Sequence, residues 1–323
     1  ILPGQDSAYA WQGFIPTEEN PMIKNPERGF VSSANQKSTD QTYPYYLGAA
    51  SNFPVYRGVI INRKLSELTN ATAQDIQRLQ MDNYNVFAEM ARPVLMKYID
   101  QTSLTADEKK YINILSSWNL VSDVKEKGAS VFNVIWDSLE TTIWSDEFAG
   151  ATTSIGWPDE ITLLESIKRD SLYSFADNIK TPSKKETIAD AVMEAVKKAT
   201  AVLVKADKEG KLDWAAFKDT RVSHLLKINA LSSLHLPIGG GKHIINATTE
   251  THGPSWRMIV HMTDDIEAFG VYPGGQNGNP GSKYYDTFMN HWATGKYYPI
   301  LFMHLKDAPN NKRVKWLMSF TKA

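Results

Sequence analysis

The order in which the hydrophobic pattern changes along the chain is the feature that most constrains its fold. Residues 1–65 are rich in turn signals, residues 66–217 place apolar side chains at helical spacing, and residues 218–323 return to strand candidates and glycine-rich turns. Helices gathered between strand-bearing ends are typical of an α+β arrangement, whereas a parallel sheet requires alternating strands and helices. We therefore predict an α+β fold with a central helical section (66–217) flanked by β-rich segments (1–65 and 218–323).

Capping signals and residue propensities predict the individual elements. Three residue pairs have the spacing of a helix-starting capping box: Thr72 and Asp75, Thr105 and Glu108, and Ser183 and Glu186. The expected helices run from Thr72 toward Arg92, from Thr105 to near Gly128, and over residues 130–148, 158–180 and 183–205. The expected strands, chosen for their β-branched and aromatic residues, are 28–34, 55–62, 244–249, 255–262 and 267–272.

Composition excludes several classes of function. The 323 residues include 35 basic and 36 acidic side chains, so no net field attracts nucleic acid or an anionic membrane surface. Cysteine is absent, which excludes disulfides, thiolate metal ligands and cysteine nucleophiles. No apolar run approaches the roughly 18 residues of a membrane-spanning helix. We expect neither nucleic acid nor a membrane as a partner.

Residues 13–46 contain the strongest candidate for a functional residue. Asn20-Pro21 and Asn25-Pro26 force extended or turn geometry, and the small side chains that follow Phe30 end in the carboxamide of Asn35. Small residues leave space, and a carboxamide can donate N–H groups into that space. We predict that Asn35 faces an active site, although an asparagine here also suits a cap at a strand end or turn.

Ordered motifs near both ends of the chain point to a family. The first set is Gly13-Phe-Ile-Pro16, the two Asn-Pro pairs, Gly29-Phe30, Ala34-Asn35, Tyr43-Pro44 and Tyr56-Arg57. The second set is Gly253–Arg257, Val271–Pro280, Tyr284–Asp286 and Trp292. Together they resemble the β-chain of the penicillin acylase (penicillin amidase) family, and the resemblance is weakest in the helical middle. It implies that the chain is part of an αββα N-terminal-nucleophile (Ntn) hydrolase sandwich.

The resemblance also implies a reaction, which is hydrolysis of a linear amide by acyl transfer to an N-terminal serine whose α-amino group is the base. Ile1 has no hydroxyl, so we expect that serine upstream and expect this chain alone to be inactive. Its expected partners are the upstream part of the same precursor (the α-chain and the N-terminal part of the β-chain) and a small acylated amine. Asn35 matches the family's oxyanion-hole asparagine, and Arg57 matches an arginine near it. The family resemblance implies a periplasmic or secreted location.

Several alternatives stay open from the residues alone. Arg57 also suits a surface or salt-bridging role. Gly253–Arg257 suits either substrate positioning or a scaffold in which Trp256 fills the core and Arg257 pairs with a buried carboxylate. The whole chain also suits a non-catalytic binding module that keeps the acylase scaffold. A weaker alternative is a carbohydrate-binding surface formed by Trp136, Trp144 and Trp157.

No cofactor is expected on this chain. No two histidines have the one-turn spacing of a helical zinc site. Some members of the resembled family bind calcium between chains, partly through an acidic residue just after a Tyr-Pro pair. Here Tyr45-Tyr46-Leu47 follows Tyr43-Pro44, so a calcium site in the complete protein finds no support in this chain.

Overall fold

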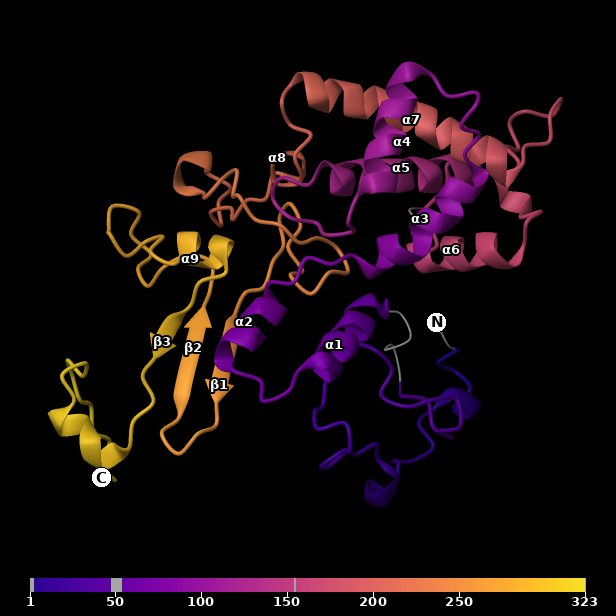
Figure 1. The fold of residues 1–323 in the computed structure, drawn as a ribbon. Helices are drawn as coiled ribbons and strands as arrows, with labels where there is room; N and C mark the ends of the chain where they lie inside the picture. The colour runs from indigo at the N-terminus through magenta and orange to yellow at the C-terminus, as the bar shows by residue number, and fades with distance from the viewer. Residues whose placement is uncertain (1–2, 48–53, 154, 323) are drawn as a thin grey trace. The chain divides into compact units, whose positions relative to one another are not determined.

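The computed structural model describes residues 3–47, 54–153 and 155–322, and the chain divides into two compact units, Ile1–Glu67 and Leu68–Ala323 (Figure 1). The helical section and the C-terminal strands belong to one unit. Helices and one small sheet make up the regular structure of the described residues, which agrees with the α+β class but not with the β-rich segment predicted at 1–65.

The first unit is mostly irregular. Its described residues form the 3-10 turns η1 (Ser7–Tyr9) and η2 (Thr17–Glu19) and the helix α1 (Tyr56–Glu67), and they contain no strand. The strand predicted at 28–34 is therefore wrong. The Phe30 carbonyl accepts from the Arg28 side chain and the Ser32 carbonyl from the Gln36 side chain, so local side chains replace a neighbouring strand as partners.

The strand predicted at 55–62 is also wrong, because this segment enters helix α1. Tyr56 and Ile60, one helical turn apart, are buried, while Val55 and Val59 are exposed. Gly58 between them is also buried, so burial alone does not separate a helix from a strand here. The backbone does, because the Val59 N–H donates to the Val55 carbonyl at 2.9 Å, the four-residue spacing of an α-helix. β-Branched residues favour strands only weakly, and packing on one helix face overrides that preference here.

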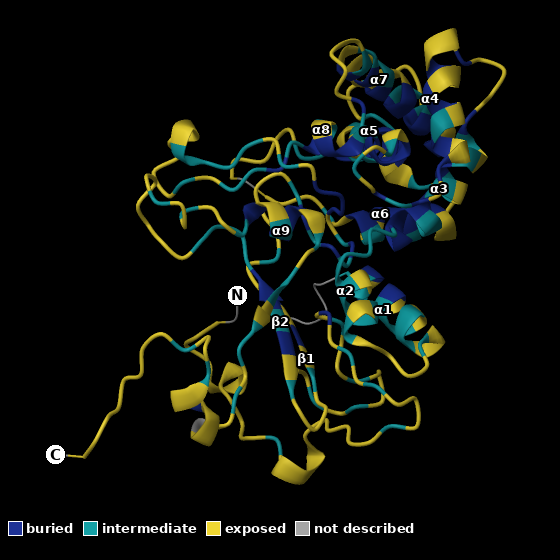
Figure 2. Cartoon of the chain, turned by 60° about the vertical axis from the view of Figure 1, so that its left-hand side comes forward, coloured by how far each residue is buried: buried dark blue, intermediate teal, exposed yellow. Residues whose placement is uncertain are grey.

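The helical section of the second unit contains seven α-helices within its described residues. They are α2 (Ala73–Gln80), α3 (Val86–Tyr98), α4 (Ala106–Ser117), α5 (Lys127–Trp144), α6 (Glu160–Arg169), α7 (Ile188–Lys208) and α8 (Trp214–Lys218). Helices α5 and α7 pack against each other, and α4 contacts both. Figure 2 shows the buried stripes on these helices. The apolar face predicted for α7, which includes Ile188, Val192 and Val196, is buried as expected.

Four predicted helices differ in extent. The helix expected from Thr105 to near Gly128 ends at Ser117, and the helix expected over 158–180 ends at Arg169. The helix expected from Thr72 is two helices, α2 and α3, because Asn85 caps a new start through the Ala88 N–H and Tyr84 pairs with Val121 in an isolated bridge. The helix expected over 183–205 starts at Ile188. Its capping box is Thr187 with Asp190, whereas the predicted Glu186 accepts hydrogen bonds from Asn178 N–H and the Thr181 hydroxyl.

We expect Thr187→Ala to lower the free energy of unfolding by about 1 kcal/mol, the usual cost of losing such a cap. The Thr187 hydroxyl accepts from the Asp190 N–H at 3.2 Å, and the Asp190 carboxylate accepts from the Thr187 N–H at 2.9 Å. Urea denaturation followed by far-UV circular dichroism measures the loss. Thr200→Ala is the control, because its hydroxyl bonds only the Val196 carbonyl inside α7. Equal losses in both variants would contradict the capping role.

The second unit ends in a small antiparallel sheet. Strands β1 (Arg257–His261), β2 (Glu267–Val271) and β3 (Tyr298–Ile300) lie in the order β1-β2-β3. The strands predicted at 255–262 and 267–272 are confirmed with slightly shorter bounds. The strand predicted at 244–249 is wrong, since this segment folds back on buried Asn246, whose carbonyl accepts from the N–H groups of Gly241 and Thr248.

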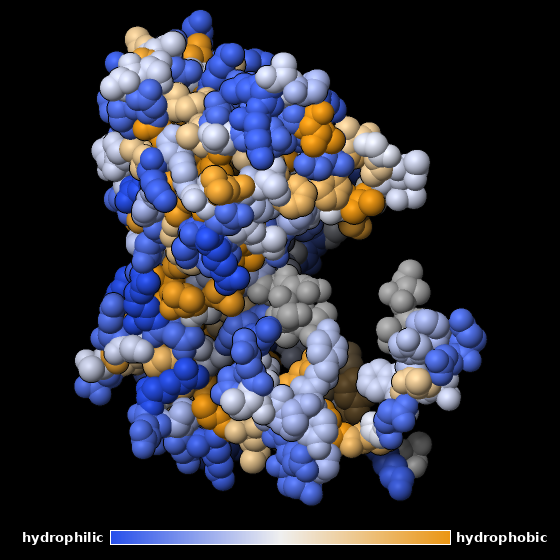
Figure 3. Space-filling view, turned by 90° about the vertical axis from the view of Figure 1, so that its right-hand side faces the viewer, coloured by the Kyte–Doolittle hydropathy of each residue, from blue (hydrophilic) through white to orange (hydrophobic). Residues whose placement is uncertain are grey.

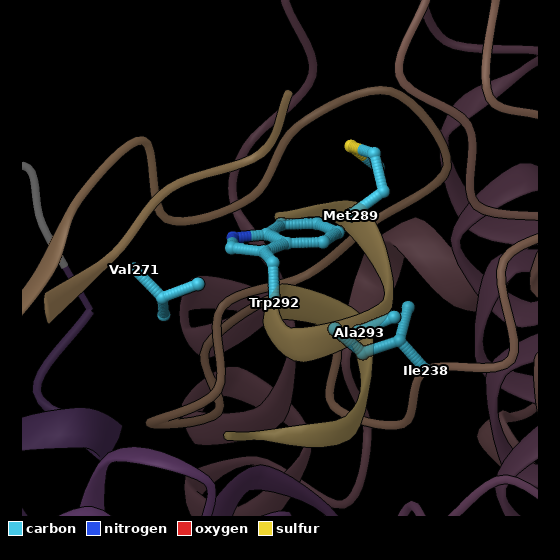
Figure 4. Close-up of a cluster of buried hydrophobic side chains, with 5 residues drawn as sticks. All are labelled: Ile238, Val271, Met289, Trp292 and Ala293. Carbon is cyan, nitrogen blue, oxygen red and sulfur yellow. The ribbon is translucent and has the colours of Figure 1, made fainter. Parts of the chain in front are cut away.

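Helix α9 (Met289–Thr294) carries the largest side chain of the core beside the sheet. Trp292 is 1% exposed, and its indole N–H donates to the Pro254 carbonyl at 2.8 Å. Figure 4 shows the buried cluster around it, which consists of Ile238, Val271, Met289, Trp292 and Ala293. The cluster joins α9, β2 and the loop before Gly239 into one apolar core.

Candidate active site

Asn35 lies in the irregular loop of the first unit in a left-handed backbone conformation. Its φ is +65°, a region that few residues other than glycine adopt and in which asparagine is enriched. The residue is exposed, while the preceding Ala34 is buried. The side-chain Oδ1 of Asn35 accepts a hydrogen bond of 2.7 Å from Nη2 of Arg57. The structure thus brings together the two residues that the sequence singled out.

The contact with Arg57 determines which way the Asn35 carboxamide faces. A guanidinium has only donors, so it is compatible with the carboxamide oxygen and not with the carboxamide nitrogen. Among the hydrogen bonds of the described residues, none involves Nδ2 of Asn35. Both N–H groups of Nδ2 are therefore available to donate to an acceptor that does not belong to this unit.

Helix α1 presents Arg57 in its first turn and is tied to the preceding loop by Asn62. Oδ1 of Asn62 accepts from Arg28 Nη1 at 2.9 Å and from the Ser32 hydroxyl at 3.1 Å. Its Nδ2 donates to the Gly58 carbonyl at 2.7 Å. One helical side chain thereby fixes the loop before Asn35 to the turn of α1 that carries Arg57.

The chemical capacity of this pair is stabilisation of a negative charge. Asn35 offers N–H donors, and the permanently charged Arg57 bonds the opposite end of the same amide. A cation hydrogen-bonded to the oxygen of an amide polarises its N–H bonds and strengthens their donation. Neither side chain is a nucleophile, so the pair supplies charge stabilisation and positioning but not bond formation.

The scaffold alternative for Gly253–Arg257 is only partly correct. Trp256 does not fill the core, because it is 48% exposed; the buried tryptophan is Trp292. Arg257 is buried, but it donates to the Trp292 carbonyl at 2.7 Å and to Oδ1 of Asn246 at 3.0 Å, and not to the buried carboxylate that was expected. Burial lowers the pKa of Arg257 from its ordinary value.

The structure argues against the carbohydrate-binding surface. Trp136 and Trp144 are buried within α5, and only Trp157 of the three is exposed. Trp136 packs edge-on against Phe87, and its indole N–H donates to Glu140 at 2.8 Å. Two of the three supposed sugar-stacking rings therefore belong to the helical core.

Sequence reasoning missed two ionisable groups in the second unit, the buried Lys218 and the half-buried Glu140. Burial lowers the pKa of Lys218 to about 7, and its Nζ donates to the carbonyls of Gly239 and Thr248 at 2.7 and 2.8 Å. Burial also raises the pKa of Glu140 to about 7 against the opposing hydrogen bond from Trp136. No local signal marks these positions, because long-range packing buries them.

Neither a metal site nor a membrane-spanning helix is found in the part of the chain that the structure describes. No group of three or more His, Asp or Glu side chains there could hold a metal ion. No helix there combines the length and apolar character needed to cross a membrane.

Comparison with known proteins identifies the relatives of the chain. The model of the penicillin amidase family matches residues 1–306. The acyl-homoserine lactone acylase QuiP of Pseudomonas syringae pv. syringae is 24% identical over 92% of this chain and 40% of its own length, and QuiP of Pseudomonas aeruginosa is 22% identical over 97% and 42%. Penicillin acylase 2 proenzyme of a Pseudomonas species matches 43% of the chain at 26% identity.

A solved structure shares the fold. The thermostable penicillin G acylase of Alcaligenes faecalis superposes with a TM-score of 0.59 at 14% identity, over 97% of this chain and 61% of that one. At this identity the likeness concerns the fold alone. The chain spans about two fifths of the length of its first curated relatives.

Proposed function

The chain belongs to the penicillin amidase family, and we propose on that basis that it forms part of an Ntn hydrolase that cleaves linear amides. In this proposal a serine upstream of Ile1 attacks the amide carbonyl, and the acyl group passes to that serine and then to water. Asn35 donates an N–H to the oxyanion that forms during each attack, and Arg57 holds the Asn35 carboxamide in the donating direction.

The main support for this proposal is the hydrogen bond between Arg57 and Oδ1 of Asn35. Attack on a carbonyl moves negative charge onto oxygen, and a donor that is aimed in advance stabilises this charge without reorganising. The bond to Arg57 leaves Nδ2 of Asn35 as the outward donor, which is the arrangement that an oxyanion hole requires. The same hydrogen bond favours a positioning role for Arg57 over a role as a surface or salt-bridging residue.

The first unit supports an upstream partner because it has almost no core of its own. Trp11, Phe14 and Met22 are each at least 89% exposed, and Ala34 is the one buried apolar residue among the described residues 3–47. Hydrophobic side chains open to solvent are also visible in the view of Figure 3. Exposed apolar groups on this scale mark surfaces that another chain segment covers. We propose the upstream part of the same precursor as that cover.

The sheet of the second unit supports the same partner. Ile259 of β1 is buried on one face, whereas Met258 and Val260 present apolar side chains to solvent on the other. A strand that is apolar on both faces is typical of a sheet covered by two layers. This face is where the second layer of the expected αββα sandwich would pack.

N-Acyl homoserine lactones are the substrate class we propose. Relatives named acyl-homoserine lactone acylase match more than nine tenths of the chain, whereas the relative named penicillin acylase 2 proenzyme matches 43%. An acylated lactone amine also fits the linear-amide chemistry proposed for Asn35. The upstream segment would supply most of the acyl pocket. A periplasmic or secreted location of the complete protein belongs to the same proposal.

The test is an amine-release assay on the complete gene product. We expect it to liberate free homoserine lactone from N-acyl homoserine lactones of several chain lengths, while the 323-residue chain alone releases none. A serine-directed acylating reagent should label the complete protein and leave this chain unlabelled. Absence of both amine release and labelling in the complete protein would favour the non-catalytic binding module, and labelling of this chain would mean that the nucleophile lies within residues 1–323.

A further inference from the structure

Gln36 holds the backbone on the N-terminal side of Asn35 through both ends of its own carboxamide. Its Oε1 accepts from the Ala34 N–H at 2.6 Å, and its Nε2 donates to the Ser32 carbonyl at 3.1 Å. Since the acceptor and the donor are both engaged, the Gln36 amide cannot turn over without losing both bonds. The side chain thus closes a ring around residues 32–36.

This ring encloses a residue whose backbone conformation needs support. Asn35 has a φ of +65°, and a residue other than glycine stays in that region only when its surroundings determine it. Ala34, which precedes Asn35, is anchored by burial and by the bond to Gln36. Loss of the Gln36 side chain would free the Ala34 N–H and the Ser32 carbonyl together, and with them the conformation of Asn35.

Gln36 also contacts helix α1 at the position next to Arg57. A Cβ placed on Gly58 would lie 3.3 Å from Oε1 of Gln36, so the side chain lies directly against the backbone of this helical turn. The same side chain therefore touches the loop that presents Asn35 and the turn that presents Arg57. It sets the spacing across which the 2.7 Å bond between these two residues forms.

We infer that Gln36 is a positioning residue that holds the Asn35 carboxamide in its donating direction. This inference rests on the proposed function, in which Asn35 stabilises the oxyanion. Gln36 itself touches no reacting atom. Its effect passes through Asn35, which distinguishes it from a residue that only stabilises the fold.

The experiment is a double-mutant cycle in the complete protein. We expect Gln36→Leu to lower kcat for amide cleavage on the order of 100-fold with KM within about twofold, because a misplacement of about 1 Å in a catalytic group has effects of this size. Gln36→Glu, which keeps the acceptor but loses the donor, should lower kcat less. In an Asn35→Ala background, Gln36→Leu should change kcat by no more than about twofold.

Gln12→Leu is the matched control, since Gln12 also bonds nearby backbone carbonyls, those of Ser7 and Ala10, in the same unit. Gln12→Leu should leave kcat unchanged. We expect both Gln12→Leu and Gln36→Leu to shift the midpoint of thermal unfolding only slightly. Full and equal loss from Gln36→Leu in both backgrounds, or no loss in either, would overturn the inference.

A crystal structure of the Gln36→Leu variant separates this inference from the proposed function. We expect the Asn35 Oδ1 to Arg57 Nη2 distance to lengthen from 2.7 Å beyond hydrogen-bonding range. If the complete protein cleaves no amide but this distance lengthens, the proposed function fails and the positioning role stands. If the distance is unchanged, the positioning role fails whatever the activity.

Discussion

Replacing Asn35 with alanine in the complete protein is expected to lower kcat by roughly 10²–10³-fold, equivalent to about 2.7–4 kcal/mol of lost oxyanion stabilisation. The loss should fall on kcat and on kcat/KM equally, since the proposed hydrogen bond strengthens only as charge develops on the carbonyl oxygen. Steady-state release of the free amine measures it. Asn35→Asp should be at least as damaging, because a carboxylate can still bind Arg57 but has no N–H to donate and repels the oxyanion.

Asn70→Ala is a matched control for the backbone effect of that substitution. Asn70 also has a positive φ, +53°, and is exposed, but it takes no part in the proposed site. Both alanine variants remove an asparagine from the left-handed region, so a change common to both reports backbone strain. Normal turnover by Asn35→Ala would remove Asn35 from the oxyanion hole and leave only the shared scaffold.

The sequence predicted this candidate pair through the order of its motifs, and physical reasoning explains why the surrounding structure was harder to predict. Asn35 and Arg57 are 22 residues apart, and their hydrogen bond joins an irregular loop to a helix start. The loop has no periodicity, so its backbone bonds to the Gln36 side chain and its Ser32 hydroxyl bonds to the Asn62 side chain. Such contacts depend on the whole local fold, which neither propensity nor spacing encodes.

Elements with strong local signals were predicted best. The capping boxes at Thr72 and Thr105 are both present, because such a box is closed by residues three positions apart. The run at 55–62 failed for the opposite reason, since its β-branched residues suit a strand and only packing decides for the helix. The same limit explains why the expectation that Trp256 fills the core was wrong.

The different burial of Trp256 and Trp292 leads to the largest expected effect on stability. Trp292→Ala should lower the free energy of unfolding of the chain by about 3–5 kcal/mol, because it removes a fully buried aromatic side chain and leaves a cavity. Trp256→Ala should cost roughly 1 kcal/mol, since nearly half of its side chain is already in water. Chemical denaturation followed by far-UV circular dichroism compares the two variants without depending on tryptophan fluorescence.

The difference follows from what each indole contacts. Trp292 lies in the cluster with Val271 and Met289, its N–H donates to the Pro254 carbonyl, and a Cβ on Gly253 would meet its ring at 2.7 Å. Its removal therefore takes away the surface on which the Gly253–Arg257 motif folds, and it leaves the Pro254 carbonyl without its partner. Trp256 instead covers Gly270 from the solvent side of the sheet. A larger loss for Trp256→Ala than for Trp292→Ala would mean that the motif is anchored through the sheet face and not through α9.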